Sequence, residues 1–316
     1  YALKEVVDGV TANSMQISLE DAKKLTDKKV KEGDLLKMDI TAQGDFGRIA
    51  AQAARQVIMQ KLGEAEKNAI IKQFSDKVGT IISVFVQRVT REGDVICEVG
   101  KAKGVISKDD RIVNEFYRSG STLKVLLKSI EDDGKGKVMM LSRSAPEFLK
   151  ALFRVEVPEI ESESVEIVSV AREAGSRSKV AVRSIVEGVD PIGACVGQKG
   201  VRINAISNEL KFGNIEEKVD IILWDEDIET FIMNSIRPAE ALKVELVDKA
   251  NQKAMIVVAD AQQSLAIGKE GQNVRLSSKL TGWTLDIKSE TEYKELKQET
   301  APKKKKSKKS EETAAQ

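Results

Sequence analysis

The sequence has no histidine and only two cysteines, and both shortages exclude kinds of site. Histidine is the commonest general base and metal ligand, so its absence argues against most hydrolases and most zinc enzymes. Cys97 and Cys195 have no CxxC partner, which excludes a disulfide framework and a cysteine-rich zinc site. We expect both cysteines in hydrophobic cores and expect no metal or cofactor. Enzymes built on carboxylates, lysine or serine stay open.

Long apolar runs are also lacking. No run approaches the roughly 18 residues that a membrane helix needs, and no charged-then-apolar signal segment opens the chain. We therefore expect a cytoplasmic protein without membrane contacts. The 316 residues are 41% hydrophobic and 32% charged, which predicts two to four well-solvated domains.

The net charge of +1 conceals a segmented chain. Residues 77–144 carry 13 basic and 9 acidic side chains, whereas residues 145–236 carry 10 basic and 17 acidic ones. The hydrophobic period changes near the same places. We expect four domains and a disordered lysine-rich tail, over residues 1–76, 77–144, 145–225, 226–290 and 291–316. The tail is either an electrostatic arm for a polyanion or a solubilising end.

The first domain contains one long helical pattern, from about residue 47 to residue 74. Apolar residues recur at spacings of three and four, which marks one face of an amphipathic helix: Ile49, Ala53, Val57, Ile58, Leu62, Ala65, Ala69 and Ile70. Two interpretations are open. The favoured one is that this face packs on its own α/β domain, and the other is that it docks a partner.

Five short β-branched runs, separated by turn residues, follow in fewer than 70 residues and predict a five-stranded β-barrel of the OB type. Such barrels bind single strands by stacking and by charge. The candidate contacts are aromatic residues and positively charged residues of this segment: Phe85, Arg88, Lys101, Lys103, Lys108, Phe116, Tyr117 and Arg118. Each aromatic residue has packing in the core or against a loop as its alternative role.

The remaining domains repeat one pattern. The order helix, strand, strand, helix, helix, strand occurs twice, and each copy joins its last two helices through a glycine turn. The turns are Gly-Gln-Lys-Gly at 197–200 and Gly-Lys-Glu-Gly at 268–271, which lie 71 residues apart. A single turn of this kind is readily explained by geometry alone, but recurrence with matching flanks favours a function.

A helix that starts at such a turn presents unpaired N–H groups and a positive dipole end. Glycines let a phosphate approach the backbone, so the turns are typical of KH domains, which bind about four unstacked nucleotides. The P-loop and dinucleotide fingerprints are absent, so no cradle for nucleotide hydrolysis is present. The alternative is a tight helix–helix turn with glycines for geometry only.

An acidic group follows the strand "VDIILW": Asp225, Glu226, Asp227 and Glu229. Carboxylates are favourable at the start of a helix, so helix capping is the favoured interpretation over a divalent metal site.

The stretches "SRSAPEFLKALFRVEVPEI", "DPIGACVGQKGVRINAI", "VDIILW" and "AIGKEGQNVRLSSKLTGW" resemble the NusA family of bacterial transcription termination and antitermination factors. The resemblance extends from about residue 1 to residue 289. It implies a multidomain α+β fold: an N-terminal α/β domain with a long helix, an S-one-type OB barrel and two type II KH domains in tandem.

The resemblance also implies a non-enzymatic, monomeric factor that binds RNA polymerase, nascent single-stranded RNA and other Nus factors, and that modulates pausing, termination and antitermination. It implies polymerase contacts on the helix that carries Arg48, Arg55 and Lys61. The RNA contacts that it implies are Gly197, Gln198, Lys199, Gly200, Arg202, Gly268, Lys269, Glu270, Gly271, Gln272, Asn273 and Arg275.

Two departures from the family are expected. The chain opens at Tyr1 and is expected to lack the helical part that begins the family's N-terminal domain, and no acidic repeats follow residue 290. Two other functions stay open: an RNA-processing or translation accessory, such as the binding end of an exoribonuclease, and a scaffold that acts without polymerase.

Overall fold

The computed structural model describes residues 2–8, 15–26, 29–38, 45–113, 115–132, 134, 136–213 and 216–300. The chain divides into two compact units, residues 1–67 and 68–316. Within the described residues, no helix has the length and apolar character needed to span a bilayer.

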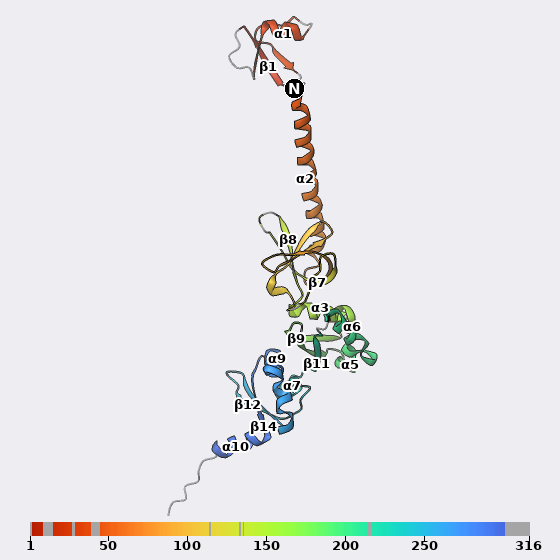
Figure 1. The fold of residues 1–316 in the computed structure, drawn as a ribbon, viewed down its shortest axis with the longest axis vertical. Helices are drawn as coiled ribbons and strands as arrows, with labels where there is room; N and C mark the ends of the chain where they lie inside the picture. The colour runs from red at the N-terminus through yellow and green to blue at the C-terminus, as the bar shows by residue number, and fades with distance from the viewer. Residues whose placement is uncertain are drawn as a thin grey trace, which may run out of the picture. The chain divides into compact units, whose positions relative to one another are not determined.

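The first unit is built on a three-stranded sheet in the order β2-β1-β3 (Figure 1). Its elements are β1 (Ala2–Val7), β2 (Gln16–Ser18), α1 (Leu19–Leu25), β3 (Leu35–Met38) and the first part of α2 (Asp45–Ser75). Ser18 caps α1, because its hydroxyl accepts a hydrogen bond from the backbone N–H of Asp21. Val6, Ile17 and Ala22 form the small core.

The expected packing of the long helix on its own domain is wrong for the described residues. Ile49, Val57, Ile58 and Leu62 on α2 are all more than half exposed. The periodic apolar pattern predicted the helix correctly, but a pattern alone does not show what covers the face.

The second unit begins with a closed barrel, which confirms the five predicted strands. The strands run in the order β4-β5-β6-β8-β7: β4 (Ile81–Val89), β5 (Val95–Val99), β6 (Ala102–Ile106), β7 (Thr122–Asp132) and β8 (Lys137–Ser142), with a short 3-10 turn η1 (Lys108–Asp110). Buried and partly buried residues alternate along β5, as expected where one face meets a core. Ile70, Ile71 and Phe74 from the end of α2 pack against this core.

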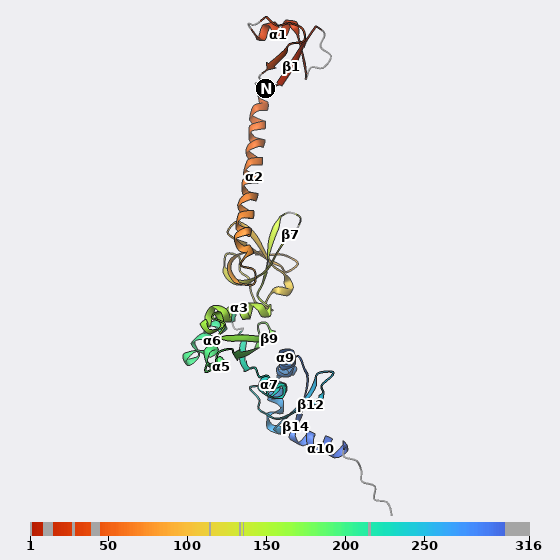
Figure 2. The same ribbon diagram turned by 180° about the vertical axis from the view of Figure 1, so that it is seen from behind.

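Two domains of one topology follow, as predicted (Figure 2). The first contains α3 (Pro146–Glu156), α4 (Pro158–Glu161), β9 (Val165–Glu173), β10 (Arg177–Ser184), α5 (Pro191–Val196), η2 (Gln198–Gly200), α6 (Val201–Leu210) and β11 (Lys218–Leu223). The second contains α7 (Ile228–Ser235), β12 (Ala241–Asp248), β13 (Lys253–Val258), η3 (Asp260–Gln262), α8 (Gln263–Ile267), η4 (Lys269–Gly271), α9 (Gln272–Thr281) and β14 (Thr284–Ser289). In each sheet the middle strand pairs antiparallel with the first strand and parallel with the last.

Barrel and repeats are joined by equivalent contacts. Arg143 at the end of the barrel donates a hydrogen bond of 3.3 Å to the carbonyl of Glu209, near the end of α6. Ser169 of the first repeat donates one of 2.9 Å to the carbonyl of Leu280, near the end of α9. Glu209 and Leu280 each lie nine positions after the second glycine of the turn in their repeat. The end of the helix that follows each turn is therefore capped by a side chain of the preceding domain.

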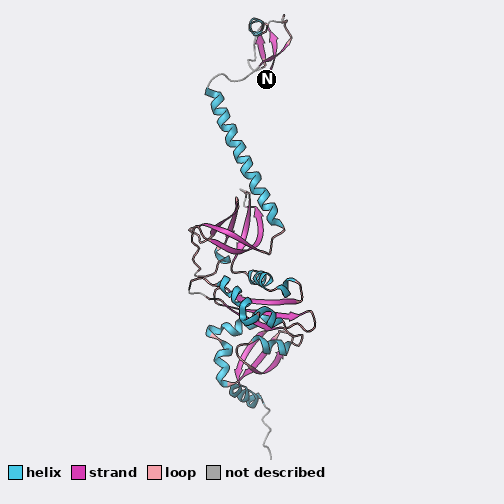
Figure 3. Cartoon of the chain, turned by 90° about the vertical axis from the view of Figure 1, so that its right-hand side faces the viewer, coloured by secondary structure: helices cyan, strands magenta, loops and turns pink. Residues whose placement is uncertain are grey.

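The outer face of the first repeat's sheet is covered by helices of the second (Figure 3). The shared cluster contains Ala171, Ala181, Ile222, Phe231, Leu276 and Leu280.

The expected disordered tail is wrong for its first part, because α10 (Glu290–Thr300) is helical. Ser289 and Glu292 form a capping box, in which each side chain bonds the other residue's backbone N–H at 3.2 Å. The S-x-x-E spacing was present in the sequence and predicts this helix start. The lysine-rich segment 301–316 lies outside the described residues.

Candidate nucleic-acid interface

The first glycine of each turn is required by the turn's own geometry. Gly197 has φ 73° and ψ 171°, and Gly268 has φ 76° and ψ 170°, a region that essentially only glycine occupies. A Cβ on Gly197 would lie 2.8 Å from Cγ of Arg202, and one on Gly268 would lie 2.8 Å from the backbone N of Asn273. The first glycine therefore admits the helix that follows, rather than a ligand.

The residue five positions after that glycine forms hydrogen bonds with the helix that precedes the turn. Arg202 Nη1 donates to the carbonyl of Ala194 at 2.6 Å, and Asn273 Nδ2 donates to the carbonyls of Ala266 at 3.0 Å and Leu265 at 3.4 Å. These carbonyls end the helix before each turn, where they have no intrahelical partner. Two different side chains thus cap the same place in the two repeats.

The last two positions of each turn face outward. Lys199 has φ 52° and ψ 26°, and Glu270 has φ 52° and ψ 29°, so both adopt the left-handed conformation. Gly200 and Gly271 follow at φ 78° and 70°. A Cβ on either glycine meets nothing closer than 3.4 Å, so the outward side of the second glycine is open.

The middle side chains of both turns are exposed: Gln198, Lys199, Lys269 and Glu270. No other part of the described chain covers them. The helices α6 and α9 begin directly after the turns, so their N-terminal amides and positive dipole ends lie at this surface. A cavity of about 650 Å³, lined by Asp190, Gly193, Gly197 and Gln198 among others, adjoins the first turn. This arrangement can hold a phosphate.

Four of the residues predicted to contact RNA make hydrogen bonds or ion pairs within the protein instead: Arg202, Gln272, Asn273 and Arg275. Arg202 also pairs with Glu159 at 2.8 Å. Asn273 is only 4% exposed, and its amide also donates to the carbonyl of Ile236 at 2.8 Å, so its side chain does not reach the surface where RNA was expected. The sequence showed that these residues follow the turn but not which way they point.

Gln272 and Arg275 reach the first repeat. Arg275 Nε lies 2.6 Å from Glu173, and Gln272 Nε2 donates to Glu173 at 2.9 Å and to Ser176 at 2.7 Å. The hydrogen bond from Arg275 is the main cause that lowers the pKa of the Glu173 carboxyl. These contacts join the start of α9, directly after the second turn, to the end of β9 and the residues that precede β10 in the first repeat. Glu173 and Ser176 were not singled out from the sequence, because their partners lie about 100 residues away.

A buried lysine also joins the repeats. Lys179 on β10 is fully buried and donates from Nζ to the carbonyl of Arg237, just after α7, at 2.5 Å. Burial lowers its pKa to about 8, although Asp220 at 3.6 Å acts in the opposite direction. The interface between the two repeats therefore contains one buried charged group, and the charge of that group depends on pH.

The barrel candidates divide into two groups. Phe85 is 47% exposed and Phe116 is 74% exposed, and Arg88, Lys101, Lys103, Lys108 and Arg118 are exposed too. Tyr117 is a core residue, so its core alternative applies: its hydroxyl donates to Glu115 and accepts from the N–H of Ile112.

The polymerase candidates lie on an exposed helix. Arg48, Arg55 and Lys61 on α2 are all exposed, and Lys61 pairs with Glu64 at 2.8 Å.

The capping interpretation of the acidic group is confirmed. Asp227 is the N-cap of α7, and its carboxylate accepts hydrogen bonds from the N–H and the hydroxyl of Thr230. The bond from the Thr230 hydroxyl is the main cause that lowers the pKa of Asp227. Among the described residues, no group of three or more acids or cysteines has a metal-binding arrangement.

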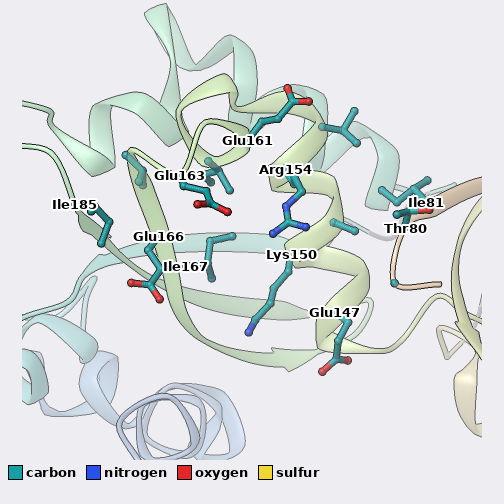
Figure 4. Close-up of a pocket in the computed structure, with 15 residues that line it drawn as sticks. Thr80, Ile81, Glu147, Lys150, Arg154, Glu161, Glu163, Glu166, Ile167 and Ile185 are labelled. Atoms are coloured by element: carbon teal, nitrogen blue, oxygen red, sulfur yellow. The ribbon is translucent and has the colours of Figure 1, made fainter. Parts of the chain in front are cut away.

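A groove that no residue of the two turns lines lies between α3 and β9 (Figure 4). Its volume is about 990 Å³. Lys150 and Arg154 point into it from α3, and Glu163, Glu166 and Ile167 line the opposite side. Because cations and carboxylates face each other across it, the groove is a poor match for a polyanion.

Comparison with known proteins decides the family. Residues 1–68 match the NusA N-terminal domain, residues 143–224 match the NusA-like first KH domain, and residues 228–295 match the NusA-like second KH domain. The transcription termination/antitermination protein NusA of Bacillus subtilis is 43% identical over 296 residues, which cover 94% of this chain and 78% of that protein. The chain belongs to the NusA family.

Other NusA proteins are similarly close. The transcription termination/antitermination protein NusA of Thermus thermophilus is 41% identical over 294 residues, covering 93% of this chain and 74% of that protein. The repeats are thus NusA KH domains, which indicates RNA binding. Among solved structures, a multidomain protein with nucleic acid binding domains from Streptococcus pneumoniae aligns with 42% of this chain and 41% of its own, at 14% identity and a TM-score of 0.19, too low to support an argument.

Proposed function

We propose that this chain is an RNA-binding transcription factor that binds RNA polymerase and nascent single-stranded RNA and modulates pausing, termination and antitermination. It acts in the cytoplasm as a non-enzymatic monomer, together with other Nus factors. The observation that carries the RNA part is the pair of exposed glycine turns, which share one backbone geometry and open their second glycine to the surface. Membership of the NusA family supports the transcriptional part.

The RNA contacts that we propose are the exposed turn positions, Gln198, Lys199, Lys269 and Glu270, with the glycines beside them. Phosphates of one strand approach the amides of both turns, and the two lysines neutralise part of their charge. Because the Glu173 contacts fix one repeat against the other, both turns are offered to the same strand.

The test replaces the four exposed turn residues with aspartate in one variant. Binding of a single-stranded RNA oligonucleotide should weaken at least tenfold, because negative charge then meets phosphate. The matched control is the double variant Lys150→Asp and Arg154→Asp, which makes a similar charge change in the groove between α3 and β9, where no turn residue lies. Equal losses in both variants, or none in the turn variant, would refute the assignment of the site. Circular dichroism checks that both variants fold.

Polymerase binding is tested without RNA. Core RNA polymerase should retain the chain in a pull-down, and the triple variant Arg48→Glu, Arg55→Glu and Lys61→Glu should be retained less. An RNA-processing accessory or a polymerase-independent scaffold predicts no retention of either protein.

A further inference from the structure

One aromatic side chain is held outward at the end of the barrel that meets the first KH domain. Phe116 is 74% exposed, the highest exposure among the large apolar side chains that the structure describes. Aromatic residues make up only 4% of the chain, and a phenylalanine buries 150 to 250 Å² when it is packed, so leaving one in water forfeits much stabilisation. Its outward position makes Phe116 a candidate contact for a ligand.

The exposure is imposed by the residues on either side. Glu115 is 2% exposed and pairs with Arg143 at 2.8 Å, and Tyr117 is 9% exposed and bonds the N–H of Ile112. Phe116 lies between these two buried anchors, so its backbone is fixed and its ring is directed to the surface. A loosely placed loop does not explain this exposure.

A second aromatic ring comes from the KH domain. Phe212, two residues after α6 ends, has its ring centroid 6.4 Å from that of Phe116, with an angle of 47° between the planes. An ion pair of 2.9 Å between Lys124 of the barrel and Glu209 of α6 also joins the barrel to the first KH domain, three residues before Phe212. The tilt and the exposure leave a face of Phe116 available for stacking.

The charges beside the pair favour a polyanion. Arg118 and Lys211 are exposed, and within the described part of the chain neither makes an ion pair. An exposed ring, a partly exposed second ring and cations without an ion pair are the elements of a site for single-stranded nucleic acid. An apolar protein partner would gain nothing from the two cations.

The position matches the proposed RNA path. The helix α6 begins at the first glycine turn and ends beside Phe212 after ten residues, about 15 Å. A KH domain holds about four nucleotides, so a strand gripped at the turn reaches the length of this helix.

We propose that Phe116 and Phe212 form a base-stacking site, shared by the barrel and the first KH domain, for one unpaired base of the RNA strand held at the first glycine turn. This proposal rests on the proposed function of the turns. It makes the barrel and the KH domain read one continuous strand instead of two separate ones.

The test measures binding of a single-stranded 12-nucleotide RNA to the full chain. Phe116→Ala and Phe116→Leu should each weaken binding roughly tenfold to a hundredfold, because neither side chain offers a π face, whereas Phe116→Tyr should bind like the native chain. A 2-aminopurine placed along the RNA should lose its fluorescence quenching at one position in the Ala and Leu variants only. If Phe116→Leu binds RNA as tightly as the native chain, the ring only packs and the stacking proposal is overturned.

The aspartate variant of the turns separates this inference from the function on which it rests. Loss of binding in the turn variant with native affinity in Phe116→Ala overturns the stacking site and leaves the RNA function in place. Native affinity in the turn variant overturns the function itself. The melting temperature of each Phe116 variant should stay near the native value, because the ring is exposed.

Discussion

The two glycine turns share a backbone but not the side chains that support it. The first and last glycines and the left-handed residue between them have closely matching φ and ψ angles in both repeats. Behind the backbone, a half-buried arginine caps the preceding helix in the first repeat, and a buried asparagine does so in the second. The geometry of the turn is therefore what the repeats have in common, while its support differs.

The outer faces of the two sheets differ in a related way. The strand registers place Lys179 opposite Asp220 in the first sheet and Met255 opposite Asp286 in the second. The first face is covered by the next domain, and Lys179 bonds into that domain. The second face instead carries a polar group around Tyr293 of α10, with Lys243 and Glu245 beside it. The outer face of the first sheet is thus adapted to packing against the next domain, and the same face of the second sheet to packing against α10.

The largest effect should come from adding a methyl group to the second turn. In Gly268→Ala the new Cβ lies 2.8 Å from the backbone N and 2.9 Å from the Cβ of Asn273, and neither atom can move away without a shift of α9, so we expect a loss of about 3 to 5 kcal/mol in the free energy of unfolding. In Gly197→Ala the Cβ meets the flexible side chain of Arg202, and the loss should be about 1 to 3 kcal/mol. Urea unfolding of the two variants measures the difference. Equal losses would show that the supports of the turns are equally rigid.

The second effect concerns the buried lysine. Its pKa of about 8 lies below the ordinary 10.5, so between these values the unfolded chain holds a proton that the folded chain lacks. The free energy of unfolding should therefore rise with pH across this window, by roughly 2 to 3 kcal/mol from pH 8 to pH 10 on account of Lys179, and the slope from this group should fade below about pH 7.

Lys179→Met copies the residue of the second repeat and should remove this slope. Urea unfolding at pH 8 and pH 10 compares it with the native chain and with Lys150→Met, a partly exposed control on α3. The pKa assignment is wrong if the Lys179 and Lys150 variants keep the same dependence on pH.

Sequence patterns predicted the parts of the fold that depend on local order. Five short β-branched runs predicted the barrel strands, and the repeated helix and strand order predicted both KH domains, because the period of the apolar residues distinguishes a helix from a strand. The capping box at Ser289 is an equally local signal, and it marks the start of α10 within the segment that composition alone predicts to be disordered.

The direction of side chains could not be predicted in the same way. Asn273 and Arg275 follow the second turn by only two and four residues, yet one points inward and the other toward Glu173 of the first repeat. Phe212 joins Phe116 only through the docking of two modules, so no spacing in the sequence announces it. A turn's backbone is encoded locally, whereas the surface that surrounds it depends on tertiary contacts.

The smallest effect should come from the ion pair between the repeats. Glu173→Gln keeps the shape of the side chain but removes its charge from Arg275, which is nearly half exposed, so we expect a loss of about 0.5 to 1 kcal/mol at neutral pH. Because its folded pKa is lowered, native Glu173 contributes fully above its ordinary value of 4.5, and the contribution disappears as the pH falls through the lower folded value. The difference between native chain and variant should therefore vanish in acid. Glu166 lies on β9, as Glu173 does, and forms an exposed ion pair with Arg183 on β10. Glu166→Gln removes this pair and serves as the control, because the pair lies within the first repeat. If the two variants lower the melting temperature equally and weaken RNA binding equally, the Glu173 contact does not align the two turns.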